Sequence, residues 1–522
     1  MKFLDKFFCS PNYNKRIKYI YSFFFGTLLV LCLPPYNFWI LIFPSISFLF
    51  FQSYLSKSSR ESFLIGWFFG FAFFLFGVYW IFNSFLIRSD IFIYLIPFCL
   101  ILLSSLLAIF TGLVSFFNYK LKRNLIANII FFSVFWTLSE ILRGYVFTGF
   151  PWNLIAHTWL NFNNILQICS VLGVYGLTFF TVLIVLSVSI ILIKEKILKK
   201  NIFYFSSVFI SIFLIILFGY VRLNNLNSSI DNSVKFRVVQ PNIKQKDKLD
   251  INYLEENFKK ILDLSFSNKL GTLNSSENLI IIWPETAITD LNYLSKSKLF
   301  NKIKLNLKKN EYIISGFFRI EQDKSPKFYN SVLVIDKSLS KTFIYDKKHL
   351  VPFGEYIPFS GILNKLGFNF IGLQKGKNSN NLINLKNTPK FKTLICYEII
   401  FPGKYSNSKN KAVFLLNLTN DAWFGNTTGP HQHFANTIFR AIEEGRNIIR
   451  VANTGISASV DPLGRIIQKI DLNNEGTFDT NIVVVKKNNK IIKTIYSRFG
   501  NALIILILIS FFCFFLKFKL KN

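Results

Sequence analysis

Long apolar blocks fill most of the first 221 residues, and one more lies near the carboxyl end of the chain. Short polar or basic segments separate them. A helix needs about 20 residues to cross the hydrocarbon core of a bilayer. The blocks that approach this length are residues 19–33, 38–54, 63–82, 91–117, 125–147, 171–193, 202–221 and 502–518. The pattern predicts a polytopic α-helical membrane domain with about eight transmembrane helices.

A polar segment of domain size, residues 222–500, interrupts this pattern. Strands are predicted at residues 234–239, 278–283, 312–318, 331–336, 342–345, 411–418, 449–453, 456–460 and 466–470, with one more leading into Cys396. Helices are predicted at residues 254–264, 296–307 and 432–444. Such a mixture is typical of a layered α/β domain. The predicted division is residues 1–221 for seven transmembrane helices, 222–500 for the inserted domain, and 501–522 for an eighth helix and a tail.

Composition and charge support a membrane protein with a defined orientation. Hydrophobic residues make up 51% of the chain, and 63 residues are Phe. The net charge of +32 could suggest nucleic acid, but the basic residues outside the polar segment gather before the first block and after the second, fourth, sixth and eighth. This alternation follows the positive-inside rule, so we predict cytoplasmic termini, an exported domain and no nucleic-acid partner. The first block ends in Cys32, Leu33 and Pro34 without a cleavage pattern, so it is expected to remain as an anchor.

Cysteine usage singles out one thiol. Of six cysteines, only Cys396 lies in the exported segment. The other five lie in or beside apolar blocks: Cys9, Cys32, Cys99, Cys169 and Cys513. A lone thiol in an oxidising compartment is a liability unless its chemistry is used, although a buried Cys can also serve as a small hydrophobe. The apolar run before Cys396 predicts a strand with the thiol at its carboxyl end, where open α/β sheets place their chemistry. We therefore expect Cys396 to be a nucleophile.

A cysteine nucleophile needs a group that accepts its proton, because a free thiol is mostly protonated at neutral pH. His431 and His433 lie just ahead of a predicted helix, but no third ligand is near them in sequence, so no metal site is predicted. Glu285 follows an apolar strand, and a dry sheet edge would make it a stronger base. A fixed ammonium from Lys347 or Lys348 could stabilise an oxyanion, and spacing alone does not choose between them.

Several motifs occur in a fixed order along the chain. They are LRGYVFTGFPW at residues 142–152, VQPNI at 239–243, WPETA at 283–287, HLVPFGE at 349–355, ICYEI at 395–399, NDAWFG at 420–425, GPHQH at 429–433 and NTGIS at 453–457. In these motifs the chain resembles the nitrilase superfamily, and more closely its integral membrane branch, the apolipoprotein N-acyltransferase family. The resemblance covers nearly the whole chain. It implies a nitrilase-like α-β-β-α sandwich inserted between the last two of eight transmembrane helices.

The resemblance also implies site residues. The family's catalytic triad falls on Glu285, Lys347 and Cys396, because the distance to HLVPFGE selects Lys347. Supporting positions fall on Glu355 as a second carboxylate, on Tyr397 and Glu398 after the nucleophile, and on Asn420 and Trp423 in a loop beside the site. One departure is Leu249, where many relatives have a Trp thought to contact substrate. This departure puts the aromatic contact in doubt, and not the triad.

The function implied by the resemblance is transfer of a fatty acyl chain from a glycerophospholipid to the α-amino group of the diacylglyceryl-cysteine of an apolipoprotein. The acyl group would pass through a thioester on Cys396, in the bacterial inner membrane, with the catalytic domain in the periplasm and with no cofactor or metal. Two other functions stay open. A membrane-tethered amidase or nitrilase would use the same triad with water. A transporter is suggested only by the number of spans, and it lacks ionisable groups at depth, since Glu140 and Arg143 lie near one outer end.

Residues 356–373, directly after HLVPFGE, are rich in apolar residues and punctuated by glycines. Water-soluble monomers rarely expose such a stretch. It is predicted to be a substrate-access lid that dips into the outer leaflet through Phe359, Phe368 and Phe370. The alternative is a loop that folds over its own domain as core.

Overall fold

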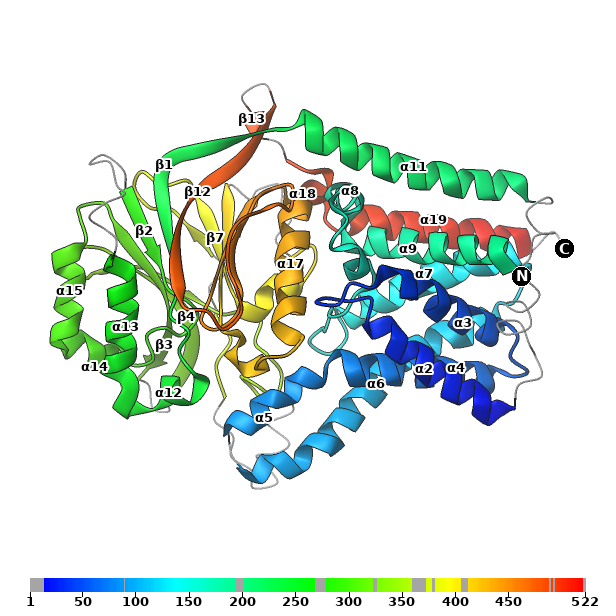
Figure 1. Cartoon of the computed structure of the whole chain (residues 1–522), viewed down its shortest axis with the longest axis horizontal. Helices are drawn as coiled ribbons and strands as arrows, with labels where there is room; N and C mark the ends of the chain where they lie inside the picture. The colour runs from blue at the N-terminus through cyan, green and yellow to red at the C-terminus, as the bar shows by residue number, and fades with distance from the viewer. Residues whose placement is uncertain are drawn as a thin grey trace.

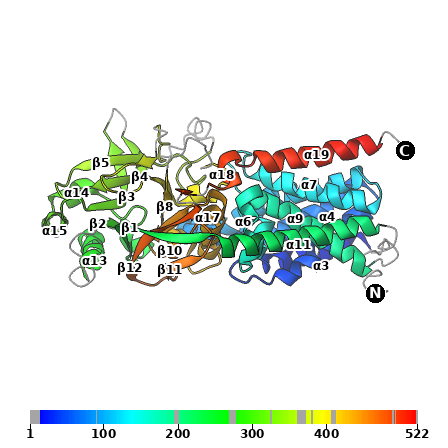
Figure 2. The ribbon, with the colours of Figure 1, turned by 90° about the horizontal axis from the view of Figure 1, so that it is seen from above.

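The computed structural model describes residues 14–88, 90–193, 201–267, 278–322, 326–358, 372–377, 381–404, 412–487, 490–491 and 493–519. A layered α/β part and a helical part lie end to end along one long axis (Figures 1 and 2). Helix α2 (Lys15–Val30) begins, and helix α19 (Ala502–Lys519) ends, at the end of the helical part farthest from the sheets.

Each of the eight predicted apolar blocks forms one helix. Besides α2 and α19, these are α3 (Ile42–Tyr54), α4 (Ser59–Gly77), α6 (Ile96–Lys120), α7 (Leu125–Arg143), α9 (Cys169–Ile193) and α11 (Ile202–Asn225). Among the described residues, five apolar helical stretches are long enough to cross a bilayer: Ser59–Gly77, Ile93–Lys120, Leu125–Arg143, Cys169–Ile191 and Ile202–Asn225. Trp39–Tyr54 and Ala502–Cys513 are apolar but shorter. The helices are thus confirmed, and the number of spans stays a prediction.

Short helices connect the long ones. They are η1 (Trp39–Leu41), η2 (Tyr79–Phe82), α5 (Asn83–Arg88), η3 (Asp90–Leu95), η4 (Ile155–Trp159), α8 (Asn163–Leu166) and α18 (Ile495–Phe499). Helix α7 ends four residues before its predicted limit, because the chain turns after Arg143 and the Arg143 carbonyl accepts the N–H of Phe150. Helix α9 bends at Gly173, whose φ of +69° suits glycine and whose missing side chain leaves room for Tyr496.

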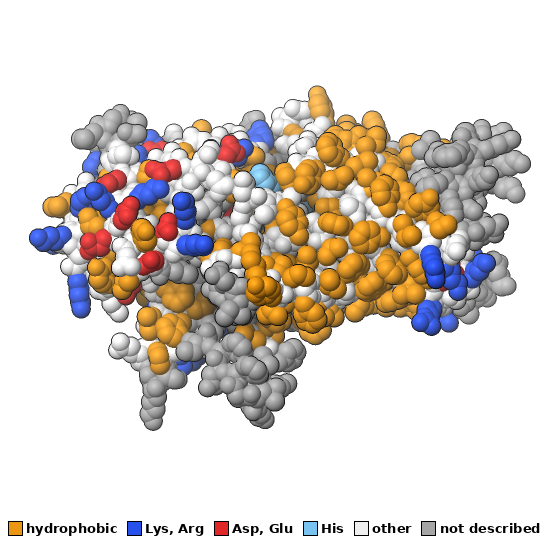
Figure 3. Space-filling view, turned by 60° about the horizontal axis from the view of Figure 1, so that its bottom comes forward, with side chains coloured by type: hydrophobic (Ala, Val, Ile, Leu, Met, Phe, Trp, Pro, Cys, Tyr) orange, Lys and Arg blue, Asp and Glu red, His pale blue; other side chains and the backbone are white. Residues whose placement is uncertain are grey.

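The helical part is apolar outside and closely packed inside. Its surface is covered by apolar side chains, whereas charged side chains gather on the α/β part and a basic group lies at the opposite end (Figure 3). Inside, a side chain on Gly26 would overlap the backbone of Phe69, and one on Gly70 would overlap Thr111. Small residues of this kind let membrane helices approach closely. The apolar outer band is what a bilayer would cover.

The α/β part contains two sheets. The seven-stranded sheet has the order β13 (Lys490–Ile491), β12 (Gly476–Lys487), β1 (Asn227–Gln240), β2 (Asn278–Ile282), β3 (Tyr312–Glu321), β4 (Lys327–Ile335) and β5 (Lys341–Asp346). The six-stranded sheet has the order β11 (Ile466–Ile470), β10 (Ser457–Val460), β9 (Asn447–Ala452), β8 (Phe414–Thr419), β7 (Phe391–Ile395) and β6 (Leu382–Ile383). In the centre of each sheet three strands run parallel, namely β1, β2 and β3 in the first and β7, β8 and β9 in the second.

The two sheets pack face to face, and helices cover their outer faces. Ile280 and Ile282 of β2 share a core with Phe391 and Phe414 of the other sheet. The alternate residues of β2 pack against the helical layer formed by α13 (Leu254–Phe266), α14 (Leu291–Lys296) and α15 (Lys298–Asn306). Helix α17 (Gly429–Glu444) covers the second sheet. Both faces of β2 are buried, which explains its unbroken apolar run. The predicted α-β-β-α sandwich is confirmed.

The structure differs from the sequence-based prediction at the edge of the first sheet. Strand β12 was not predicted, and β1 begins at Asn227, seven residues before its predicted start. The extra part of β1 is polar and pairs antiparallel with β12, with a register shift between Asp231 and Lys235. Its strand conformation therefore comes from backbone pairing and not from burial. Two short helices before α13 were also missed, α12 (Gln245–Leu249) and η5 (Ile251–Tyr253).

Helix α17 also connects the α/β part to the helical part. The ring of Phe439 of α17 packs against that of His157 of η4 in a tilted arrangement, with ring centroids 4.8 Å apart. The Gln432 side-chain oxygen accepts hydrogen bonds from the indole N–H groups of Trp80, at 3.0 Å, and Trp152, at 2.8 Å. The LRGYVFTGFPW motif is thus in direct contact with the layer that covers the second sheet.

Candidate active site

Glu285, Lys347 and Cys396 each follow the end of a strand and are buried. Glu285 lies three residues after β2, and Lys347 directly follows β5. Cys396 directly follows β7 in the opposite sheet and opens the short helix η6 (Cys396–Ile400). The carboxyl ends of strands from both sheets therefore supply the three predicted catalytic side chains.

A buried network joins Glu285 to Lys347. The Lys347 ammonium lies 2.9 Å from Glu355 Oε1 and 3.4 Å from Glu285 Oε1. Asn330 Nδ2 donates to both carboxylates, at 2.7 Å to Glu285 and 2.9 Å to Glu355. Burial disfavours the ammonium, but the two carboxylates outweigh it and hold the pKa of Lys347 above its usual value. Lys348 is partly exposed and donates its backbone N–H to Glu398, so Lys347 is the lysine beside Glu285.

The Cys396 backbone lies in the left-handed region, with φ of +47°, which is strained for a residue with a side chain. Burial, and then the charge of Glu285, raises the pKa of the Cys396 thiol, while Lys347 and a hydrogen bond with Thr419 act in the opposite direction. The resting group is therefore the thiol. Chemistry at this sulfur needs a nearby base.

The carbonyl of Cys396 is held by a buried cluster. His433 Nε2 lies 3.3 Å from this carbonyl oxygen, and His433 Nδ1 lies 2.8 Å from Asp421 Oδ1. Arg450 Nη2 donates to Asp421 Oδ2 at 2.6 Å. The ligand atoms of Cys396, Asp421 and His433 lie within 4.8 Å of one another, a spacing that could hold a metal ion. Because Arg450 and His433 already engage Asp421, the arrangement is better suited to supporting the nucleophile loop.

Two arginine–aspartate pairs with the same distance of 2.6 Å test this support. Arg450→Met is expected to lower the midpoint of thermal unfolding by roughly 10 °C, because it leaves the fully buried Asp421 carboxylate without its cation. Arg465→Met removes the charged partner of Asp461, which is also buried but keeps hydrogen bonds from the backbone N–H groups of Leu463 and Arg465. Because the Arg465 side chain is 41% exposed, a shift of at most about 2 °C is expected. Differential scanning fluorimetry in detergent measures both midpoints. Equal shifts would mean that burial does not strengthen the Arg450 pair.

Glu398 ties the nucleophile loop to the loop that carries Lys347. Its carboxylate accepts hydrogen bonds from the Tyr345 hydroxyl at 2.9 Å and from the backbone N–H groups of Lys348 at 3.0 Å, His349 at 3.2 Å and Ile395 at 2.8 Å. Substitution of this carboxylate would disturb both loops at once.

The same two loops contact the helical part. The Tyr397 hydroxyl donates to the Gly149 carbonyl at 2.8 Å, and His349 Nε2 lies 2.9 Å from the Thr148 carbonyl. Burial, and then the charge of Lys404, lowers the pKa of His349 to about 4. The ring is therefore neutral and can donate from Nε2 to Thr148 while Nδ1 accepts from Lys404 at 2.7 Å. The TGFPW loop thus sits against the residue that follows the nucleophile.

The NDAWFG loop is connected by hydrogen bonds to α12 and to the NTGIS motif. Asn420 Nδ2 donates to the Gln245 side chain at 2.7 Å, and Asn453 Nδ2 donates to Asn420 Oδ1 at 3.1 Å. Trp423 lies in η7 (Asp421–Phe424) and is half-buried.

Sequence reasoning missed Lys248, which is buried and whose ammonium donates to the Glu285 carbonyl at 2.7 Å. Its signal was the three-residue spacing from Gln245, which places both side chains on one face of α12.

Some predictions are not informed by the structure. Phe359, Phe368 and Phe370 of the predicted lid lie outside the described residues. Leu249 is the last residue of α12, and the question of its aromatic counterpart in relatives stays open.

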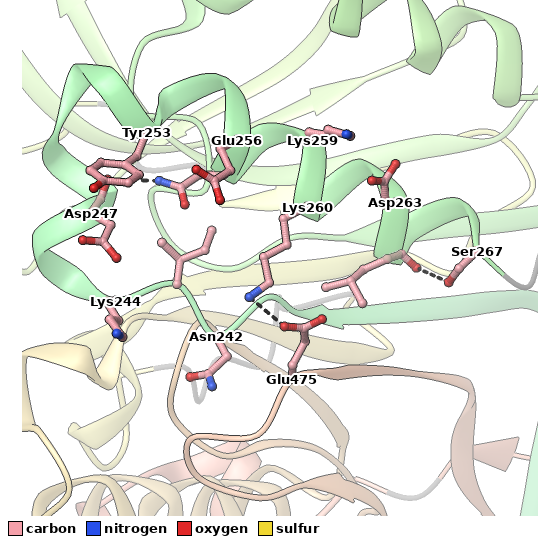
Figure 4. A pocket seen from close by; sticks show the side chains of 13 residues that line it. Asn242, Lys244, Asp247, Tyr253, Glu256, Lys259, Lys260, Asp263, Ser267 and Glu475 are labelled. Atoms are coloured by element: carbon pink, nitrogen blue, oxygen red, sulfur yellow. Dashed lines mark hydrogen bonds and ion pairs between the residues drawn. The ribbon is translucent and has the colours of Figure 1, made fainter.

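A groove of about 680 Å³ lies along α12 and α13 (Figure 4). Lys260 and Glu475 form an ion pair of 2.6 Å in it. Its lining is largely charged and polar, and Glu285, Lys347 and Cys396 are not among the described residues that line it. It lacks the convergent buried titratable groups expected of an active site.

Comparisons with known proteins agree with the two-part architecture. The model of the apolipoprotein N-acyltransferase N-terminal domain matches residues 25–187, and the carbon-nitrogen hydrolase model matches residues 236–486. An apolipoprotein N-acyltransferase of Rhodopseudomonas palustris is 33% identical over 492 residues, which cover 91% of this chain and 90% of the relative. One from Rickettsia prowazekii is 36% identical over 450 residues, which cover 84% and 86%. This chain belongs to the apolipoprotein N-acyltransferase family.

Solved structures that resemble this member of the apolipoprotein N-acyltransferase family are more distant. A CN-hydrolase superfamily protein from Xanthomonas campestris has 16% sequence identity and a TM-score of 0.34, and the match covers 48% of this chain and 90% of that chain. An amidase from Nesterenkonia sp. has 14% identity and a TM-score of 0.34, with coverage of 48% and 90%.

Membership of the apolipoprotein N-acyltransferase family confirms the predicted family and reaction class. The chain is a membrane-embedded acyltransferase of the bacterial inner membrane that N-acylates lipoproteins, with lipid and lipoprotein as substrates. The amidase and transporter alternatives are set aside, because the relatives that carry this name match both the helical part and the α/β part.

Proposed function

We propose that the α/β part, residues 222–500, transfers an acyl chain from a glycerophospholipid to the α-amino group of the diacylglyceryl-cysteine of an apolipoprotein. Glu285, Lys347 and Cys396 are the catalytic residues. The observation that carries this proposal is the buried Glu285–Lys347–Glu355 network at strand ends, whose charges act on the only described thiol of the α/β part. On the face shown in Figure 3, the apolar surface of the helical part adjoins the α/β part.

In the first half-reaction, Glu285 accepts the Cys396 proton and the thiolate attacks the ester carbonyl carbon of the phospholipid. The Lys347 ammonium stabilises the oxyanion of the tetrahedral intermediate. The carbon–oxygen bond then breaks, Glu285 returns its proton to the leaving oxygen, and lysophospholipid departs. The acyl chain remains on Cys396 as a thioester.

In the second half-reaction, the neutral α-amine of the lipoprotein attacks the thioester carbonyl. Glu285 takes a proton from the amine as the carbon–nitrogen bond forms. The carbon–sulfur bond breaks, and Glu285 returns a proton to the Cys396 thiolate. The product is an amide and the enzyme regains its starting state, so the reaction is ping-pong with no cofactor or metal.

The other predicted residues support these groups. Glu355 fixes the Lys347 ammonium, and Glu398 fixes the loops on both sides of it. Tyr397 connects the nucleophile loop to the TGFPW loop. Asn420 holds Gln245 of α12, and Trp423 lies in η7, which directly follows Asn420.

The distribution of basic residues along the helical part supports one orientation of the chain in the membrane. The buried pair of Lys18 and Glu61, at 3.0 Å, lies at the end of the helical part where α2 and α4 begin, away from the sheets. Among the described loops, the basic ones at residues 55–58 and 121–124 lie at this end, and those poor in Lys and Arg adjoin the α/β part. This separation supports cytoplasmic termini and a periplasmic catalytic domain.

Direct detection of the intermediate tests the proposal. Purified full-length protein is incubated with a phospholipid that carries a labelled acyl chain, and peptides are analysed for label on Cys396. We expect a thioester that discharges onto a synthetic diacylglyceryl-cysteinyl peptide and releases its label slowly in the absence of peptide. Discharge to water at the same rate with and without the peptide would instead indicate a hydrolase.

A further inference from the structure

Lys248 is a buried charged group that the proposed mechanism does not use. Its side chain is 4% exposed, and its ammonium donates to the backbone carbonyl of Glu285 at 2.7 Å, not to a carboxylate. Helix α12 presents it on the same face as Gln245, which is bonded to Asn420. A long, buried side chain is costly to place in this way unless its charge is balanced.

The charges around the proposed catalytic residues do not balance without Lys248. Glu285 and Glu355 contribute two negative charges, and Lys347 contributes one positive charge. Transfer of the Cys396 proton to Glu285 moves one negative charge from the carboxylate to the sulfur and leaves the total unchanged. In a buried site, a like charge disfavours ionisation and an opposite charge favours it. With Lys248 added to Lys347, two positive charges balance the two carboxylates, Glu285 and Glu355, before the reaction begins.

The backbone around Glu285 also needs support. Thr286, directly after it, has a φ of +47°, which is unfavourable for a residue branched at Cβ. The hydrogen bond from Lys248 holds the carbonyl between these two residues. The direction of the Glu285 side chain toward Asn330 and Lys347 depends on this segment.

We propose that Lys248 is a positioning residue of the acyl transfer: it fixes the backbone of Glu285 and places a second positive charge within hydrogen-bond reach of this segment, which favours the thiolate and the oxyanion. This inference rests on the proposed function, because it takes Glu285 and Cys396 as the base and the nucleophile.

The electrostatics agree with this role. Burial lowers the pKa of Lys248 to about 8, while Glu285 and Cys396 act to raise it. The ammonium is thus the main form at neutral pH. Among the other groups that face Cys396, Glu285 and Asp421 raise the pKa of the thiol and Lys347 lowers it.

The remaining ionisable neighbours are Glu355 and His433. Glu355 acts through its pairing with Lys347, and His433 contacts the carbonyl of Cys396. Neither supplies a free positive charge to the sulfur. Lys248, whose ammonium donates to the Glu285 carbonyl, is a further buried cation beside these catalytic residues.

The rate of Cys396 alkylation tests the proposal. Full-length protein in detergent is treated with iodoacetamide between pH 6 and pH 7.5, where Lys248 is mainly the ammonium, and labelling at Cys396 is followed by mass spectrometry. Lys248→Met is expected to slow alkylation at pH 7 about tenfold. N-acylation of the lipopeptide is expected to fall in parallel.

Two variants control this experiment. Lys248→Arg keeps a positive charge and is expected to be alkylated at pH 7 at a rate within about threefold of the wild type. Lys246→Met removes an exposed charge from the same helix and is expected to leave both alkylation and N-acylation unchanged. The thermal unfolding midpoint of each variant reports whether it is folded.

The outcomes separate this inference from the proposed function. A wild-type alkylation rate in folded Lys248→Met overturns the role of Lys248, whatever the activity. If Lys248→Met does not fold, alkylation of Lys248→Arg more than about tenfold slower than that of the wild type overturns it. Activity that persists in Cys396→Ser instead removes the proposed catalytic residues themselves.

Discussion

Cys396→Ser is expected to abolish N-acylation, with a loss of at least about 10⁴-fold. The substitution keeps the size of the side chain but replaces the thiol by a hydroxyl, which is far less acidic. Burial and the charge of Glu285 already hold the Cys396 thiol in its protonated form. A hydroxyl in the same place would not be deprotonated by a carboxylate, so no labelled acyl-enzyme is expected. Single-turnover assays with labelled phospholipid measure the loss.

The matched control is Cys513→Ser. Cys513 is exposed on α19, far from the sheets, and its substitution is expected to change the rate by less than about twofold. Retained N-acylation in Cys396→Ser would show that another group forms the covalent intermediate or that none is formed.

Lys347→Met is expected to lower the rate of acyl transfer by about 10² to 10³. This lysine is the buried cation that lies within 3.4 Å of Glu285 and 2.9 Å of Glu355. Without it the oxyanion loses a preorganised positive charge, and two carboxylates that share Asn330 are left to repel each other. Both effects act on kcat. The rate at saturating phospholipid and lipopeptide is the measurement.

Lys348→Met provides the comparison, because Lys348 is next in sequence and partly exposed. Its backbone N–H, which bonds to Glu398, is unaffected by the substitution, so a change of at most a few fold is expected. A larger loss for Lys348→Met than for Lys347→Met would exclude Lys347 as the oxyanion cation. Thermal midpoints for both variants separate a loss of chemistry from a loss of folding.

The sequence alone determined the two-part architecture and the identity of the nucleophile candidate. Apolar blocks that are nearly long enough to cross a bilayer form helices, because lipid cannot hydrogen-bond the backbone and a helix satisfies its N–H and C=O groups internally. The strands of the sandwich core were also predictable, since β2 is buried and apolar on both faces and β7 is apolar where it leads into Cys396. Cys396, Glu285 and Lys347 were identified by motifs, and the structure places each directly at or just beyond a strand end.

Only the tertiary structure decided which groups complete the site. Asn330 and Arg450 carry no local signal of function, and Lys248 has only its spacing from Gln245, because each acts through a hydrogen bond to a residue more than 25 positions away. The long β1–β12 ribbon was hidden for the same reason: its polar residues are strand-forming only when the partner backbone is present. Local pattern reports burial and periodicity, whereas hydrogen bonds between distant segments form only when the fold brings donor and acceptor together.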